Sequence, residues 1–305
     1  MRVKSLKIII LIAVLWSGSL WALNVDPFRP AFDGDHHFLV YRSSTLPAGG
    51  WGAGYYINYA KRSLEVGEVG TLAGVSPVID DLMTMGFMGA YGLTDQLSVG
   101  LSVPFSPFFT FQEIGSTVSE NKMAVGDISL GAKFRFWSLE SEKSEQDSWS
   151  VGAAVVPEIS LPTGSNSKFL GDPKITGTLK GVLDFQYANT QISLNLGFRF
   201  REKEDFLNLS VGQEFVYGVG LSQEVWESQA VSVTSEFVGS TTLNGSPGSS
   251  NNIPMEWLLG ADKAWTFETI PGKFSTSLGT GLGVTHGYGT PAFRVFGMLK
   301  YVWGD

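Results

Sequence analysis

The segment at residues 126–137, GDISLGAKFRFW, places the strongest constraint on how this chain can fold. Its apolar side chains occupy every second position, at Ile128, Leu130, Ala132, Phe134 and Phe136. The positions between them carry Ser129, Gly131, Lys133 and Arg135. Successive side chains of a β-strand point to opposite faces of the sheet. The segment therefore predicts a strand with one apolar face and one polar, partly cationic face.

The same alternation recurs along the chain and is clearest at residues 192–200, where Ile, Leu and Phe occupy every second position. Turns and polar loops rich in Gly, Asn, Ser and Asp separate the segments, as is typical of strand connections. The repetition predicts an all-β fold of about twelve antiparallel strands. The expected strands are residues 51–60, 79–91, 97–103, 126–137, 149–159, 175–187, 192–200, 206–221, 230–239, 255–265, 274–285 and 293–303.

Residues 1–22 have the composition of a secretion signal. Arg2, Lys4 and Lys7 precede an apolar run at residues 8–16, and residues 17–22 lead to the expected cleavage after Ala22. The apolar run is too short to span a bilayer. No later stretch reaches the length of a transmembrane helix. We therefore expect an exported protein that does not cross a membrane with helices.

Aromatic residues collect at one end of the expected strands when the first strand runs outward and the directions then alternate. They lie on the apolar face and would form an interfacial girdle: Trp51, Tyr91, Trp149, Tyr187, Trp265 and Trp303. A soluble β-sandwich, the alternative, gives no reason for such a ring. Because an unpaired backbone group is costly in hydrocarbon, the sheet must close. Residues 50–305 are thus predicted to form a transmembrane antiparallel up-and-down β-barrel in the bacterial outer membrane.

Residues 23–49 form a polar, proline-containing lead before the first strand. Its composition predicts a periplasmic N-terminal segment, with a position inside or under the barrel as the alternative. His36 and His37 with Asp33 and Asp35 are residue types that bind metals. Four polar side chains in a flexible lead are more often solvated, so we predict no metal site.

The polar faces of the strands define a candidate lumen of mixed charge. Its main candidates are Lys133, Arg135, Lys174, Lys180, Asp184, Arg199, Glu214, Glu236 and Glu256, to which Glu158, Arg201 and Asp262 add. Charges inside a narrow barrel must pair or be hydrated. Two interpretations stay open, a polar pore or ligand site and an ionic network that supports the wall.

Composition and motifs argue against several functions. Removing the three basic residues of the signal from 21 leaves 18 against 29 acidic residues, and this net charge of −11 argues against nucleic-acid binding. The chain has no cysteine, so no disulfide is expected. Its three histidines, His36, His37 and His286, form no recognisable catalytic triad. We predict neither enzymatic activity nor a cofactor.

Several segments resemble known barrels. PFRPAFDGDHH, LPAGGWGAGYYINYA, GAYGLTDQLSVGLSVP, GDISLGAK, LPTG with FLGD, and GYGTPAFRVFGMLKY resemble the N-terminal barrel of large OmpA-like outer-membrane proteins. The GD…GAK strand and the PTG loop are also similar to the transporter-like barrels associated with meta-pathway phenol degradation. Many relatives continue into a peptidoglycan-binding domain, whereas this sequence stops two residues after Trp303, so no cell-wall tether is expected.

The functional prediction is a passive, transporter-like pore for small solutes in the outer membrane. The alternative is a structural outer-membrane barrel with an occluded lumen. Expected partners are outer-membrane lipid, the barrel insertion machinery during assembly, and a small-molecule solute. A monomer is expected, with no nucleic-acid partner.

Overall fold

The computed structural model describes residues 24–33, 37–67, 75–112, 119–141, 148–165, 170–206, 209–243, 253–267 and 269–304. The expected signal peptide at residues 1–22 lies outside the described residues. In the part of the chain that is described, no helix has the length and apolar character needed to cross a membrane.

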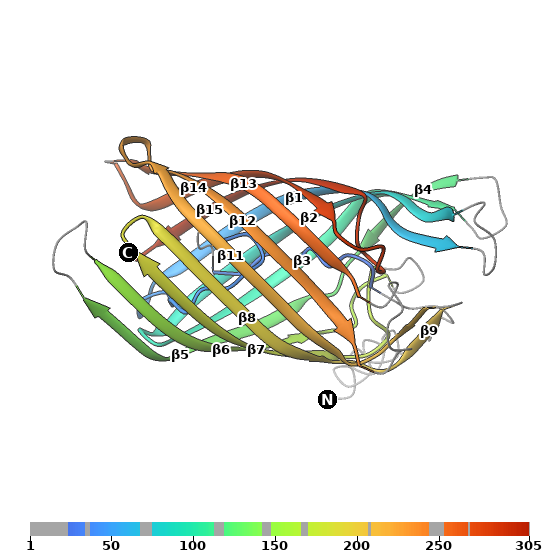
Figure 1. Ribbon diagram of the computed structural model, residues 1–305, viewed down its shortest axis with the longest axis horizontal. Coiled ribbons are helices and arrows are strands. Elements are labelled where there is room, and N and C mark those ends of the chain that lie inside the picture. Colours follow the sequence, from blue (N-terminus) through green and yellow to red (C-terminus); the bar gives the residue numbers. More distant parts are fainter. Residues whose placement is uncertain are drawn as a thin grey trace, which may run out of the picture.

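Twelve antiparallel strands close into a barrel, which confirms the predicted fold class (Figure 1). Each strand pairs with the next, and β1 pairs with β15 to complete the ring. The barrel strands are β1 (Trp51–Gly67), β2 (Val75–Thr94), β3 (Leu97–Gln112), β5 (Ser129–Ser141), β6 (Trp149–Ser160), β7 (Thr176–Tyr187), β8 (Thr190–Phe200), β11 (Glu214–Trp226), β12 (Val231–Thr242), β13 (Met255–Phe267), β14 (Ile270–Gly283) and β15 (Phe293–Trp303).

Two segments at the end of the barrel where the longer loops lie differ from the predicted elements. The expected strand at 206–221 is instead a small hairpin, β9 (Glu204–Phe206) and β10 (Leu209–Val211), followed by β11. The expected loop at 104–122 is instead mostly strand. There β3 continues to Gln112 and pairs with β4 (Ser119–Val125). Pro104 fits within β3 because the pairing of β2 with β3 is irregular next to it.

The aromatic residues expected to form a girdle lie in register at one end of the barrel, called here the girdle end. Trp51 is directly opposite both Tyr91 and Trp303, and Trp149 is opposite Tyr187. The opposite end, which carries β4 and the β9–β10 hairpin, is called here the loop end (Figure 1). Strand β1 begins and strand β15 ends at the girdle end.

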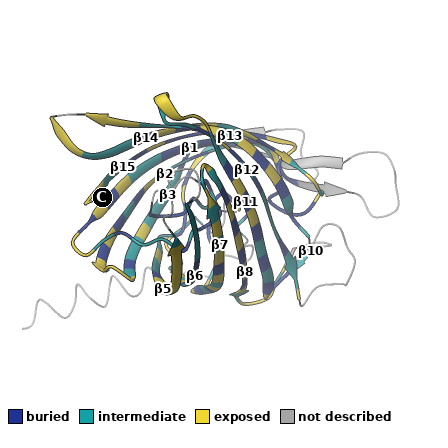
Figure 2. Cartoon of the chain, turned by 60° about the vertical axis from the view of Figure 1, so that its left-hand side comes forward, coloured by how far each residue is buried: buried dark blue, intermediate teal, exposed yellow. Residues whose placement is uncertain are grey.

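The strand surfaces alternate between buried and exposed positions (Figure 2). In β8, Ile192, Leu194 and Leu196 point outward, whereas Ser193 and Asn195 are buried in the interior. The outward residues of the barrel are mostly large and apolar, as a surface in contact with hydrocarbon requires. The barrel therefore has an apolar exterior and a polar interior.

A β-bulge in β5 explains the position of Trp137. Simple alternation from Phe134 would turn Trp137 inward. The register between β5 and β6 shifts between Arg135 and Trp137, so one extra residue is inserted. Trp137 and Leu139 consequently face outward together with Phe134. Trp137 thus joins the aromatic residues near the girdle end.

Residues 24–33 and 37–50, called here the lead, lie inside the barrel and extend toward both of its ends (Figure 1). At the girdle end, Gly49 N–H donates to the Gly92 carbonyl at 2.9 Å. At the loop end, Val25 is buried against Gly289. The periplasmic position predicted for residues 23–49 is wrong for the described part. The alternative position inside the barrel is the one observed.

Aromatic side chains of the lead build the core of the filled lumen. Phe28 and Phe38 both contact Phe296 of β15, with ring centroids 5.2 and 4.8 Å apart. Phe32 packs edge-on against Tyr41 at 5.3 Å. All five rings are buried. The hydrophobic core therefore lies inside the barrel, between the lead and the inward-facing side chains of the strands.

Gly100 of β3 and Gly131 of β5 are paired in register and make room for the Phe32 ring. A methyl group at Gly100 would overlap that ring. Gly100→Ala is therefore expected to lower the free energy of unfolding by about 1–3 kcal/mol, as overpacking of a core does. Urea unfolding in detergent micelles measures this loss. Gly177→Ala is the matched control, because a methyl group there meets no atom within 4 Å. Equal stabilities of the two variants would contradict this packing.

Candidate functional site in the lumen

Inward-pointing side chains of the wall strands bind the backbone of the lead. Glu236 of β12 accepts hydrogen bonds from Phe38 N–H at 2.6 Å and from Leu39 N–H at 2.9 Å. Asn195 of β8 forms a reciprocal pair with the Tyr41 backbone, with both bonds at 2.8 Å. The lead is not part of the barrel sheet, so its backbone groups need such side-chain partners. Side chains of the wall thus supply the hydrogen bonds that a neighbouring strand would otherwise give to the backbone of the lead.

Asp184 of β7 and Lys133 of β5 bind the part of the lead closer to the girdle end. Asp184 accepts bonds from Ser43 N–H at 3.1 Å and Ser43 Oγ at 2.5 Å. Lys133 Nζ forms an ion pair with Asp33 and donates to the Arg42 carbonyl at 3.1 Å. Both partners of that ion pair are buried. A buried charge requires this kind of pairing.

His37 is buried in the lumen, so the expectation that it is solvated is wrong. Its Nε2 lies 3.1 Å from Ser193 Oγ, and its Nδ1 lies 3.5 Å from Glu236 Oε1. Asp33 is also buried and paired, whereas Asp35 and His36 fall outside the described residues. Within the described ranges, no group of three or more His, Cys, Asp or Glu residues is placed to hold a metal ion.

Arg294 of β15 organises a second buried cluster beside the lead. Its Nε donates to Glu256 at 2.6 Å, and its Nη1 donates to Asn58 at 2.7 Å. Nη1 also lies 3.6 Å from a carboxylate oxygen of Asp26 in the lead. The guanidinium lies 4.8 Å from the centre of the Phe28 ring. The cluster therefore joins the wall and the lead through one fully buried cation.

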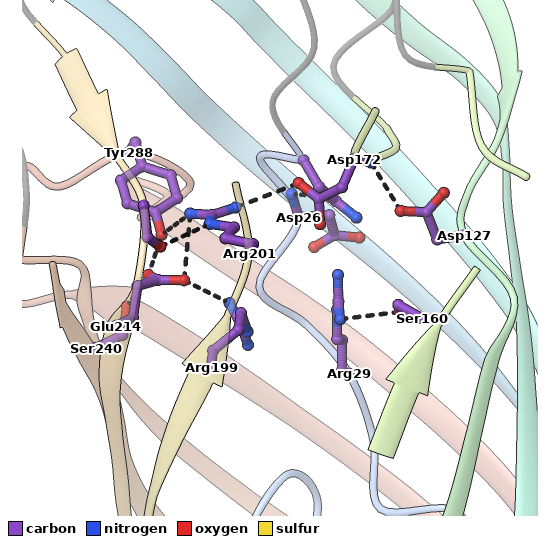
Figure 3. A network of polar contacts seen from close by, with 12 residues as sticks. Asp26, Arg29, Asp127, Ser160, Asp172, Arg199, Arg201, Glu214, Ser240 and Tyr288 are labelled. Atoms are coloured by element: carbon purple, nitrogen blue, oxygen red, sulfur yellow. Dashed lines mark hydrogen bonds and ion pairs between the residues drawn. The ribbon is translucent and has the colours of Figure 1, made fainter. Parts of the chain in front are cut away.

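At the loop end, three sequence motifs meet at Asp127 (Figure 3). Asp127, from GDISLGAK, accepts backbone hydrogen bonds from Gly164 at 2.9 Å and from Asp172 at 2.7 Å. Gly164 belongs to the LPTG segment, and Asp172 ends FLGD. Thr163 Oγ1 accepts the Ile128 N–H at 2.9 Å. These motifs therefore connect the loops to one another at the loop end of the lumen.

Arg201 extends this network to the opposite wall (Figure 3). Its guanidinium pairs with Asp172 at 3.3 Å and Glu214 at 3.2 Å, and it donates to Tyr288 Oη at 2.7 Å. Glu214 in turn accepts bonds from Ser240 at 2.7 Å, from Arg199 at 3.1 Å and from Tyr288. The charges of the loop end thus form a connected ionic network.

The ionic network gives a pH prediction at Asp127, which lies in the loop between β4 and β5. Burial, with a smaller contribution from the charge of Asp172, raises the pKa of Asp127 to about 6. A carboxyl whose pKa is raised in the folded protein binds protons more readily folded than unfolded. The free energy of unfolding should therefore decrease as pH rises from about 4 to 6 because of this group.

Asp127→Asn should remove that contribution to the pH dependence. Urea unfolding in micelles at pH 4 to 7 compares the variant with the wild type. Glu202→Gln, at an exposed loop position, is the control. If the Asp127→Asn variant showed the same pH dependence of the free energy of unfolding as the wild type, the raised pKa could not be assigned to Asp127.

Cavities remain in the lumen beside the lead, and two of them concern the site. The larger has a volume of about 120 Å³, and its lining includes Arg29, Val40, Arg199 and Val216. The smaller has a volume of about 50 Å³ and reaches toward Asp127. Arg29 lines both cavities, so it lies between them. The lead therefore narrows the lumen without filling it.

The structure places most of the predicted lumen residues inside the barrel. Those that bond within the interior are Lys133, Lys180, Asp184, Arg199, Glu214, Glu236 and Glu256. Glu158 pairs with Lys180, and Asp262 accepts a bond from Ser277 at 2.6 Å. Arg135 lies at the girdle end, where it donates to the Asp95 carbonyl at 2.9 Å.

Lys174 does not lie in the lumen. It precedes β7, which begins at Thr176, and pairs with Glu202 on the exposed surface of the loop end. Its side chain is 65% exposed. The sequence-based strand began one residue too early, at Ile175, and this extended the alternation into the loop.

Sequence reasoning also missed several lumen residues. Asn195 lies on the polar face of β8, where alternation alone could have identified it. Asp26 and Arg29 belong to the lead, which has no periodicity, and no pattern signals their positions in the lumen.

These features define a class of protein: a closed β-barrel with an apolar exterior and a polar lumen crossed by its own N-terminal segment. The family model described as "Putative MetA-pathway of phenol degradation" matches residues 68–301. The chain belongs to this family. The resemblance to phenol-degradation barrels is therefore confirmed.

Among the similar solved structures, a channel structure supports the same fold. An outer membrane channel from Pseudomonas putida F1 aligns with a TM-score of 0.54 at 15% identity, covering 86% of this chain and 98% of that one. The NanC porin aligns with a TM-score of 0.46 at 7% identity, covering 85% of this chain and 100% of that one. At these identities the likeness concerns the fold alone. A comparison with curated proteins finds no match.

Proposed function

We propose that this protein is a bacterial outer-membrane pore for small solutes, with a lumen narrowed by its N-terminal lead. The observation that carries the proposal is the cavity of about 120 Å³, which remains beside the lead and has charged side chains in its lining. A barrel whose interior only supported its wall would have no need for such a space. The fold of the family and the apolar exterior support the membrane setting.

The orientation and assembly follow from the same proposal. An even number of strands puts both barrel termini at the girdle end, which we assign to the periplasm. Export by the signal at residues 1–22, insertion by the barrel assembly machinery, contact with outer-membrane lipid and a monomeric state belong to this account. No catalytic activity is proposed. The resemblance to OmpA-like barrels stays a prediction.

A structural barrel with an occluded lumen is the second candidate. It is favoured by the firm attachment of the lead, whose backbone is bonded to Glu236, Asn195 and Asp184. In that case the lead would be a permanent plug.

Osmotic swelling of proteoliposomes separates the two candidates. Liposomes containing refolded mature protein should swell in isotonic glycine faster than protein-free liposomes, because a small solute can pass beside the lead. Sucrose, which is larger, should enter much more slowly. Faster gel migration of the unheated protein than of the boiled protein verifies that the barrel is folded. A folded barrel that gives no swelling in glycine would contradict the pore and favour the structural barrel.

A further inference from the structure

Arg29 is a cation in the lumen that is held by one long hydrogen bond. Among the described residues, its one hydrogen-bond partner is Ser160 Oγ, at 3.3 Å from Nη1 (Figure 3). This distance is longer than the usual range of about 2.7–3.2 Å. No carboxylate within the described ranges forms an ion pair with Arg29. This half-buried guanidinium has five donors, so most of them have no partner among the described residues and are open to solvent or to a solute.

Carboxylates that line the two cavities together with Arg29 are engaged with other groups. Glu158 pairs with Lys180 at 2.8 Å and accepts the Tyr41 hydroxyl at 2.6 Å. Asp26 pairs with Arg294. Asp127 accepts two backbone N–H groups of the loops. Glu158 and Asp127 attract Arg29 only at longer range, so the N–H groups of its guanidinium are available to a group that enters the cavity.

A second group with unused donor capacity lines the same cavity. Arg199 of β8 pairs with Glu214 through Nη1, but its Nε is buried and has no hydrogen-bond partner among the described residues. Thr290 Oγ1, in the loop before β15, is likewise buried without a partner there. The larger cavity therefore has donors from the lead, the wall and a loop that the carboxylates in its lining, which are engaged elsewhere, do not bond.

The rest of this cavity is apolar. Val40 of the lead, Val216 of β11 and Val238 of β12 line it, and Val40 and Val238 both lie close to Gly218. Binding sites for small molecules commonly combine apolar walls with a few polar groups that fix orientation. The cavity thus has an apolar part suited to a hydrocarbon body and a cationic part suited to an anion.

We propose that the larger cavity binds a small organic monocarboxylate with an apolar or aromatic body. The carboxylate accepts hydrogen bonds from Arg29, with Arg199 and Thr290 as further donors, and the body lies against the valines. Guanidinium and carboxylate match in charge and planar geometry. This inference rests on the proposed function, because it names the class of solute that binds within the pore.

Isothermal titration of the refolded mature barrel in detergent, with benzoate as the probe, tests the inference. Benzoate should bind at least about tenfold more tightly than benzamide, which has the same ring without the charge. It should also bind more tightly than acetate, which has the charge without the ring. Arg29→Gln should weaken benzoate binding about tenfold or more and leave benzamide unchanged. Lys174→Gln, which removes an exposed cation, should bind benzoate like the wild type.

Equal affinities of the wild type for benzoate and benzamide would overturn the inference, and this comparison does not depend on any variant folding. Unchanged benzoate affinity in a folded Arg29→Gln barrel would overturn it as well. Swelling assays keep the two proposals apart. A barrel that passes glycine without preferring benzoate would retain the pore and lose the carboxylate site. A barrel that prefers benzoate but passes no solute would retain the site and lose the pore.

Discussion

Replacing Arg294 by Met is expected to lower the free energy of unfolding of the barrel by about 3–5 kcal/mol, the range for breaking a buried ion pair. Arg294 is fully buried and pairs with Glu256 at 2.6 Å and Asp26 at 3.6 Å. Without it, two buried carboxylates lose their cation. Urea unfolding in detergent micelles, followed by tryptophan fluorescence, gives the change in stability.

Two further variants test the cause of that loss. Lys174→Met removes an exposed cation that pairs with Glu202, and it should change stability by less than about 1 kcal/mol. Arg294→Met combined with Glu256→Leu should be more stable than Arg294→Met alone, because one unpaired carboxylate is removed with the cation. An Arg294→Met barrel as stable as the Lys174→Met barrel would contradict the buried cluster.

Replacing Glu236 by Ala is expected to release the lead from the wall. The carboxylate accepts the Phe38 and Leu39 N–H groups and lies next to His37. A buried N–H group that loses its acceptor costs about 1–3 kcal/mol, so leaving two without one should raise the released fraction by a factor on the order of 10² or more. A released lead should be cut by protease, and the swelling rate in sucrose should increase.

The control for this variant is Glu140→Ala, because Glu140 is exposed near the girdle end of β5. It should retain a protected lead and the wild-type swelling rates. Mass spectrometry of the N-terminus after brief proteolysis reports on the lead directly. A Glu236→Ala barrel with a fully protected lead and unchanged sucrose entry would show that Glu236 does not anchor the segment.

Alternation was sufficient to predict the barrel wall because each strand meets lipid on one side and the lumen on the other. Trp51 lies opposite Tyr91 and Trp303 because β1 pairs antiparallel with both β2 and β15. The rule fails where a single residue is inserted, as in the bulge that turns Trp137 outward. It also fails at the loop end, where strands leave the membrane and no longer need two different faces.

The position of the lead could not be predicted from periodicity. It is an extended segment whose partners are distant in sequence, such as Asn195 for Tyr41 and Glu236 for Phe38. Its aromatic residues are buried because they fill a lumen that exists only after the barrel closes. The inward polar residues of the wall were predictable by type, whereas their partners in the lead were not.

The sequence motifs at the loop end can be recognised by resemblance, but the sequence does not indicate what they do in the structure. GDISLGAK, LPTG and FLGD were identified by resemblance alone. The structure brings them together through the two backbone bonds that Asp127 accepts. Such contacts depend on loop geometry, which alternation does not specify.

Single-channel recording of the refolded wild-type barrel in a planar bilayer tests the central claim most directly. The account predicts stable, reproducible openings of small conductance, because the lead narrows the lumen and leaves a charged cavity beside it. A bilayer that stays silent, with a folded barrel verified by its migration before and after heating, would contradict the pore and leave a plugged structural barrel.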